Sequence, residues 1–280
     1  MSLGLFSVLF AGSLAAGALG GALGMAGGIF VVPLLTLVAG ASFPDAVAVS
    51  LVSVVACSCA SAPQFLEAGL TNLRLAVVLE VATALGALVG VTLIGAIPRS
   101  ALYGIFAVVL FGSALQMAAG RSDHSRPAPS HHRPRRLDGG FTEHDGSVVT
   151  YQVVRLPWGA ALMFAAGSLS ALLGIGSGVL KIPAMDAAMR LPIKASSATA
   201  NLMIGVTACG AAAAYLLSGR LDLDLSAPVV LGSLAGSVLG ARFLVRTAAR
   251  WLRAVFTTVL LVVAVPMAAN AFGLHWGVSA

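Results

Sequence analysis

Two glycine-rich stretches interrupt long apolar runs, at residues 24–33 and 174–183. The first reads Gly-Met-Ala-Gly-Gly-Ile-Phe-Val-Val-Pro, and the second reads Gly-Ile-Gly-Ser-Gly-Val-Leu-Lys-Ile-Pro. Glycine destabilises a helix interior by about 1 kcal/mol relative to alanine, so we expect each stretch to break a helix. A break at membrane depth frees backbone N–H groups, which protein or a watery cavity must satisfy. We therefore predict that the two stretches face each other and form a binding site for a small anion.

The donors for this anion are expected where a helix restarts after each glycine stretch. A helix N-terminus carries about half a positive charge and several unpaired N–H groups. Either stretch taken alone could instead serve close helix packing, for which small residues are common in membranes. The predicted substrate-binding residues at these two positions are Gly27, Gly28, Gly176, Ser177 and Gly178.

Lys181 lies within the second stretch, one turn after the expected break. A lysine at bilayer depth costs roughly 2.5–3.5 kcal/mol on insertion scales, so it needs a partner or a task. We interpret it as a fixed positive charge beside the anion. The alternatives are a structural pair with Asp186 or Glu80, or an ammonium that extends to the membrane interface.

Three further polar residues lie within apolar segments. Glu80 is a candidate proton carrier for coupling, a candidate partner of Lys181, or a carboxylate near enough to the headgroups to stay hydrated. Thr199 and Asn201 belong to a run of small polar residues, 195–201, and are candidate hydrogen-bond donors to the anion. Hydrogen bonding between helices is the alternative role for these two side chains.

Cys57 and Cys59 raise a different class of function, because two thiols could relay electrons in a membrane thiol oxidoreductase or assembly factor. Residues i and i+2 point to different faces of a helix, which makes a disulfide between them awkward. The three cysteines show no metal-site spacing. We predict no catalytic residue, no metal ligand and no cofactor.

The composition indicates a membrane protein. Of the 280 residues, 59% are hydrophobic and only 9% are charged, whereas soluble proteins carry about 25% charged residues. A membrane-spanning helix needs roughly 20 apolar residues, and a β-barrel would show short alternating segments instead. The expected fold class is therefore an all-α polytopic integral membrane protein. The net charge of +6 does not indicate nucleic acid, because the basic residues cluster in loops.

The chain divides into two similar halves around a polar interval. Residues 1–120 and 157–280 each contain five apolar segments, and 121–156 is the linker. The first segment lacks a basic n-region, so we expect it to be a retained span. The second half repeats the first at an offset of about 150. The glycines and prolines that match at this offset are Gly24, Gly28, Pro33, Gly69, Gly86 and Gly90, which map onto Gly174, Gly178, Pro183, Gly219, Gly236 and Gly240.

An odd number of segments per half makes the two repeats inverted relative to each other. The first two segments of each half are expected to be broken or re-entrant at the glycine-rich stretch. The basic residues of the loops support the inversion, because they fall mainly on one side if every segment crosses, or if the segments form re-entrant half-crossing pairs of the same parity. By the positive-inside rule the linker is then cytoplasmic and both termini are outside. Within the linker, 122–136 is expected to be disordered, and 141–154 predicts a small hairpin around Asp145 and Gly146. Inverted repeats with paired broken segments are typical of secondary transporters.

The second half, residues 166–241, resembles the TauE/SafE sulfite-exporter family, also called TSUP, and 24–33 fits the N-terminal copy of that family. The resemblance implies a multi-pass transporter in a prokaryotic inner membrane that moves sulfite, thiosulfate or organosulfonates such as sulfoacetate. Three positions depart from the family pattern. Ser177 replaces a usual glycine and would add a hydroxyl donor, Asp186 replaces asparagine and would oppose an anion if ionised, and Ala200 replaces serine. The stretches that carry the resemblance are 174–185, 192–201, 204–208, Gly219 and the glycine pattern of 228–240.

Together these patterns predict a secondary transporter, and not an enzyme, that moves a small anion by alternating access, and the resemblance implies that this anion contains sulfur. Its expected partners are that anion and the lipid bilayer, with a homodimer as a candidate assembly and no nucleic acid. Proton coupling through Glu80 is a hypothesis. The alternatives are a carrier of another small anion or of a metal ion, and a thiol oxidoreductase that uses Cys57 and Cys59. The direction of transport and the particular anion are left open.

Overall fold

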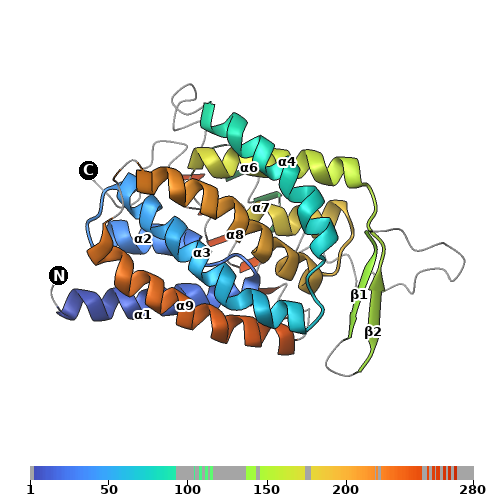
Figure 1. Cartoon of the computed structure of the whole chain (residues 1–280), viewed down its shortest axis with the longest axis horizontal. Helices are drawn as coiled ribbons and strands as arrows, with labels where there is room; N and C mark the ends of the chain where they lie inside the picture. The colour runs from blue at the N-terminus through green and yellow to red at the C-terminus, as the bar shows by residue number, and fades with distance from the viewer. Residues whose placement is uncertain are drawn as a thin grey trace, which may run out of the picture.

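The structure, a computed structural model, describes residues 3–92, 137–142, 146–173, 178–217, 219 and 222–247, with scattered positions within 104–115 and 251–269. These residues form a bundle of helices that lie side by side, with a two-stranded hairpin at one end (Figure 1). The all-α polytopic class is confirmed. Among the described residues, five helices are long and apolar enough to span a membrane: Gly4–Leu23, Asp45–Glu67, Leu73–Gly90, Ile193–Leu217 and Leu223–Arg246.

The helices of the first half follow the predicted apolar segments closely. They are α1 (Leu3–Leu23), α2 (Gly28–Val38), α3 (Phe43–Glu67) and α4 (Leu73–Thr92). The side chain of Ser42 caps α3 by accepting a hydrogen bond of 3.4 Å from the amide of Asp45. The fifth predicted segment, 99–120, lies mostly outside the described residues.

The second half repeats this order of elements. It contains α6 (Leu156–Leu173), α7 (Gly178–Pro183), the π-helical turn η1 (Ala184–Ala188), α8 (Ile193–Leu217) and α9 (Leu223–Arg246). The π turn begins directly after Pro183, which has no N–H to donate and so disturbs the α-helical hydrogen bonds. In Figure 1, α1 runs from the N-terminus toward the hairpin end of the bundle. α6 starts at the hairpin end and runs in the opposite direction.

The predicted hairpin is confirmed. Strands β1 (Gly139–Thr142) and β2 (Val148–Tyr151) pair antiparallel, with Phe141 opposite Val149. The turn contains Gly146 in the left-handed region, at φ 82°, as an Asp-Gly turn requires. The part of the linker expected to be disordered, 122–136, lies outside the described residues.

Glycines bring two helix pairs, α1 with α9 and α4 with α6, into close backbone contact. A methyl group at Gly236 would lie 2.0 Å from the carbonyl oxygen of Leu14, and one at Gly86 would lie 2.0 Å from that of Phe164. The two contacts are equivalent, because Gly236 and Phe164 follow Gly86 and Leu14 by 150 residues each. In one contact the glycine belongs to the second half, and in the other it belongs to the first. The two halves therefore pack against each other in the same way.

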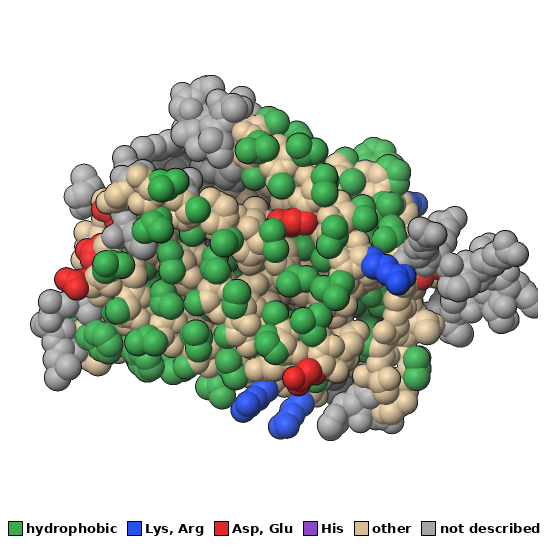
Figure 2. Space-filling view, in the orientation of Figure 1, with side chains coloured by type: hydrophobic (Ala, Val, Ile, Leu, Met, Phe, Trp, Pro, Cys, Tyr) green, Lys and Arg blue, Asp and Glu red, His purple; other side chains and the backbone are tan. Residues whose placement is uncertain are grey.

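The surface of the bundle suits a lipid environment. Figure 2 shows a face on which hydrophobic side chains are spread widely and Lys and Arg side chains are few, lying beside the hairpin and at the lower edge. At the hairpin end lie Arg74 at the start of α4, Arg155 just before α6, and Arg246 at the end of α9. The opposite end carries the acidic caps at the start of α9, where Asp222 accepts from the amides of Asp224 and Leu225.

Candidate functional site

The first glycine stretch breaks the helix, as predicted. α1 ends at Leu23 and α2 begins at Gly28, and between them Gly24, Ala26 and Gly27 adopt left-handed φ values of 71°, 55° and 72°. Glycine adopts this region readily, whereas alanine there is strained. The chain then turns back onto α1, because a methyl group at Gly20 would lie 1.9 Å from the amide nitrogen of Gly27.

The second stretch lies against the first. α6 ends at Leu173 and α7 begins at Gly178, while Gly176 and Ser177, two predicted site residues, lie outside the described residues. A methyl group at Gly178 would lie 3.1 Å from the Cα atom of Met25, which belongs to the first break. The start of α7 and the broken part of the first half are therefore direct neighbours.

The start of α8 completes this junction. A methyl group at Gly24 would lie 2.4 Å from the carbonyl oxygen of Ser197. The hydroxyl oxygens of Ser196 and Ser197 are buried, and no group among the described residues forms a hydrogen bond with them. Buried hydroxyls normally have partners, so the junction holds spare hydrogen-bonding capacity beside the first break.

Lys181 is fully buried one turn into the second half's short helix, and it pairs with Glu80 of α4 across 3.1 Å. It also donates a hydrogen bond of 3.0 Å to the hydroxyl of Thr207 on α8. Of the alternatives for this lysine, the structure shows the pair with Glu80, and full burial excludes an ammonium that extends to the interface. A buried ion pair of this kind joins α4, α7 and α8 at one point.

Thr207 connects the two charges and was not predicted. Its hydroxyl forms a short hydrogen bond with Glu80 Oε1 and lies 2.9 Å from the carbonyl oxygen of Met203. Its spacing gave little signal, because Thr207 follows the candidate Thr199 by eight residues and 3.6 residues per turn place the two side chains about 80° apart around the helix. Nor did the sequence link it to Lys181, because the two residues are 26 apart and on different helices.

Thr199 binds the connection between α3 and α4, and Asn201 binds α3 itself. The Thr199 hydroxyl accepts a hydrogen bond of 3.1 Å from the backbone amide of Asn72. Asn201 Nδ2 donates to Ser61 Oγ over 2.9 Å and to the carbonyl of Ser58 over 3.3 Å. The Asn201 contacts are the helix-to-helix bonds that were the alternative role, whereas the partner of Thr199 lies just before α4. Asn201 Oδ1 is buried with no partner among the described residues.

Gly27 and Gly28 occupy the start of α2, where donors to the anion were predicted. Gly27 packs against Ala16 of α1, since a methyl group there would lie 2.7 Å from the Ala16 carbonyl oxygen. The carbonyl of Gly28 accepts a hydrogen bond of 3.1 Å from the hydroxyl of Ser50. The first break is thus tied to both α1 and α3, and a role of its amides in binding stays a prediction.

Asn72, a second residue that the sequence did not single out, joins the hairpin to the bundle. Its Oδ1 accepts from the amide of Leu75 over 3.1 Å and so caps α4. Its Nδ2 donates to the carbonyl of Leu137 over 2.9 Å and to the Tyr151 hydroxyl over 3.3 Å. Burial raises the pKa of Tyr151, so this phenol stays neutral at physiological pH.

The thiols lie apart, as the i and i+2 spacing indicates. Cys57 is buried and donates a hydrogen bond of 3.2 Å to the carbonyl of Ser233, whereas Cys59 is exposed. Among the residues that the structure describes, no group of three or more His, Cys, Asp or Glu side chains could hold a metal ion. Neither the oxidoreductase nor the metal-carrier alternative gains an observation in its favour.

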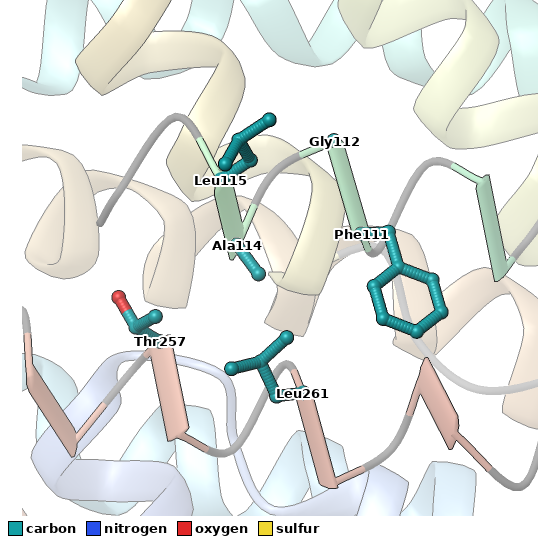
Figure 3. Close-up of a pocket in the computed structure, with 6 residues that line it drawn as sticks. All are labelled: Phe111, Gly112, Ala114, Leu115, Thr257 and Leu261. Atoms are coloured by element: carbon teal, nitrogen blue, oxygen red, sulfur yellow. The ribbon is translucent and has the colours of Figure 1, made fainter. Parts of the chain in front are cut away.

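An apolar cavity of about 320 Å³ lies elsewhere, between parts of the fifth segment of each half (Figure 3). Ala114 and Leu261 point toward one another across it. A cavity lined in this way offers an anion almost no hydrogen bonds, so it is not the candidate site. Its lining residues are Phe111, Gly112, Ala114, Leu115, Thr257 and Leu261.

Comparison with known proteins gives a consistent result over most of the chain. A sequence model of the family described as "Sulfite exporter TauE/SafE" matches residues 9–267. The chain is 26% identical over 246 residues to the "Probable membrane transporter protein YunE" of Bacillus subtilis (strain 168), covering 84% of this chain and 87% of that protein. It is also 26% identical over 223 residues to the "Probable membrane transporter protein YdhB" of the same strain, covering 80% and 84%. No solved structure matches.

Proposed function

Because this chain belongs to the sulfite exporter TauE/SafE family, we propose that it is a secondary transporter of a small sulfur-containing anion. The candidate substrates are sulfite, thiosulfate and organosulfonates such as sulfoacetate. The anion crosses the membrane by alternating access and leaves chemically unchanged.

The observation that carries this proposal is the junction of the two interrupted segments. Met25 of the first break lies against Gly178 at the start of α7, and Lys181 is buried one turn further along. Irregular backbone at membrane depth is stable only where protein or a cavity satisfies it. The buried ammonium of Lys181 is the group here that suits an anion. The unpartnered hydroxyls of Ser196 and Ser197 lie beside the first break, about 15 Å along α8 from Thr207, the partner of Lys181.

The exchange of equivalent contacts between the halves supports the alternating-access part of the proposal. The Gly236–Leu14 and Gly86–Phe164 contacts are related by the 150-residue offset, and α1 and α6 run in opposite directions (Figure 1). Both features are expected of inverted repeats over 1–120 and 157–280, joined by the linker 121–156. In such transporters one repeat moves against the other around a site near the midplane.

The charge distribution supports an orientation with the hairpin end in the cytoplasm. The starts of α4, α6 and α8 and the end of α9 lie toward that end (Figure 1), and each carries a basic residue at or beside it. Cytoplasmic loops of inner-membrane proteins carry an excess of Lys and Arg. The linker is then cytoplasmic, and the start of α1 lies on the opposite side.

A flux assay tests the proposed substrate class. The purified protein is reconstituted into proteoliposomes, and uptake of sulfite, thiosulfate, sulfoacetate, sulfate and chloride is measured. We expect one or more of the three sulfur anions named first to be transported faster than sulfate and chloride. Lys181→Ala should lose most of this flux, whereas Arg242→Ala, which changes an exposed cation on α9, should retain it.

Two results would contradict the proposal. One is the absence of flux for all five anions in liposomes that contain folded protein. The other is full activity of the Lys181→Ala variant, because the buried ammonium would then have no part in anion binding.

A further inference from the structure

The buried cluster of Lys181, Glu80 and Thr207 is electrically neutral as the structure shows it. An ammonium has three N–H donors, and Glu80 and Thr207 take two of those of Lys181 at 3.1 Å and 3.0 Å. Lys181 is 0% exposed and Glu80 only 13%. A substrate anion that approached Lys181 would bring a second negative charge to a cation that is already compensated, and low-polarity surroundings penalise this excess.

Thr207 is positioned to satisfy Glu80 in either protonation state. A hydroxyl has one proton and two acceptor lone pairs. When Glu80 is ionised, the Thr207 hydroxyl donates a hydrogen bond to Oε1. When Glu80 is protonated, the carboxyl can donate to Thr207, and the hydroxyl proton turns to the carbonyl of Met203, 2.9 Å away. Neither state leaves a polar group of this pair unsatisfied, so the geometry accommodates a proton on Glu80.

We propose that Glu80 and the substrate anion compete for Lys181, so that one proton binds Glu80 for each anion that binds the ammonium. The proton neutralises the carboxylate, and the anion replaces it as the counter-charge of Lys181. This inference rests on the proposed function and specifies its coupling as proton–anion symport. The proton cancels one negative charge of the anion, which lowers the cost of carrying that charge through the membrane.

Other charged residues lie on the elements packed against this cluster, so the test must distinguish their contribution to proton uptake from that of Glu80. They are Arg74 on α4, Lys194 at the start of α8 and Asp186 on η1, while α6 carries no charged residue. Glu67, an exposed carboxylate at the end of α3, offers a matched control for a Glu→Gln change.

Proton uptake on anion binding measures the competition directly. The full-length protein, purified in detergent in weakly buffered solution with a pH indicator, is titrated with thiosulfate and with sulfoacetate, neither of which titrates near neutral pH. We expect about one proton to be taken up per bound anion, and the affinity to fall about tenfold per pH unit where Glu80 is ionised. Glu80→Gln should still bind the anion, without proton uptake and with a pH-independent affinity. Glu67→Gln should behave as the wild type.

In proteoliposomes, Glu80→Gln should catalyse exchange of labelled thiosulfate but no longer accumulate it when a pH gradient is imposed. Wild-type protein that binds and transports the anion without taking up protons would overturn the competition while leaving the proposed function intact. Loss of binding in a monodisperse, folded Glu80→Gln protein would also overturn it. Absence of binding and flux for every anion would remove the proposed function, and this inference with it. The wild-type titration requires no substitution, so a variant that fails to fold does not prevent the decision.

Discussion

At the level of single residues, the proposed site contains a buried charge, Lys181, which is costly to place in a membrane. Lys181 and Glu80 are 101 residues apart and belong to different halves of the chain. Replacing one partner of a buried ion pair leaves the other charge uncompensated, whereas replacing both with apolar residues of similar volume is often neutral.

This asymmetry gives a stability prediction. Glu80→Met should destabilise the protein by about 3–5 kcal/mol, because it strands the buried ammonium. The Lys181→Met/Glu80→Met double variant should recover most of this loss. Thermal unfolding in detergent measures both, and equal losses in the single and double variants would show that the pair is not coupled.

The sequence predicted part of the Lys181 cluster. The burial cost of lysine predicted that Lys181 needs a partner, and Glu80 was one of the candidates. The spacing could not choose between Glu80 and Asp186, because the choice depends on which helices pack together. Thr207 was missed because one hydroxyl within an apolar helix resembles the many that bond to their own backbone, as Thr207 itself does with Met203.

At the scale of elements, composition located the breaks well and the contacts poorly. The glycines at 24–28 predicted the end of α1 and the start of α2, since left-handed φ values favour glycine. The hairpin followed from β-branched residues around Asp145 and Gly146. Its attachment through Asn72 could not be predicted, because a single amide in a short connection has many equally good partners.

The close helix pairs predict where alanine is not tolerated. Gly86→Ala and Gly236→Ala should each destabilise the protein by about 1–3 kcal/mol or more, because the new methyl group would lie 2.0 Å from a backbone carbonyl oxygen. Gly210→Ala is the matched control, since it lies within α8 with nothing within 4 Å. That variant should be neutral or more stable by up to about 1 kcal/mol. Similar unfolding temperatures for all three variants would contradict the packing.

Asn72 has two roles, capping α4 and holding the hairpin, and an isosteric substitution can distinguish them. Asn72→Asp keeps the oxygen that caps α4 but loses the Nδ2 donor to Leu137 and Tyr151. We expect faster hydrogen exchange in β1 and β2 with α4 unchanged. Asn72→Ala should lose both, with about 1 kcal/mol lost at the cap. Unchanged exchange in the hairpin of both variants would show that other contacts hold it.

For the whole molecule, how the two halves pack and which end of the bundle faces the cytoplasm are separate questions. The segment order followed from hydropathy, and the structure confirms the helices it describes. The 150-residue correspondence of the glycine contacts is a three-dimensional result that the sequence only suggested. The proposed orientation in the membrane rests on the charge of the loops, which acts while the chain inserts and does not depend on how the helices pack.

Cysteine labelling tests the proposed orientation. In a background without Cys57, Cys59 and Cys209, we place one cysteine at Val148 in the hairpin or at Gly4 near the start of α1, both exposed. A membrane-impermeant maleimide should label Gly4→Cys in intact cells and Val148→Cys only after permeabilisation. The reverse pattern would place the basic linker outside.

The most direct measurement of the central claim is an experimental structure of the protein with thiosulfate bound. We predict the anion at the junction of the two interrupted segments, within about 4 Å of Lys181 Nζ, with Glu80 no longer the main partner of that ammonium. An anion bound away from this junction, or one bound while the Lys181–Glu80 pair remains intact, would contradict the mechanism.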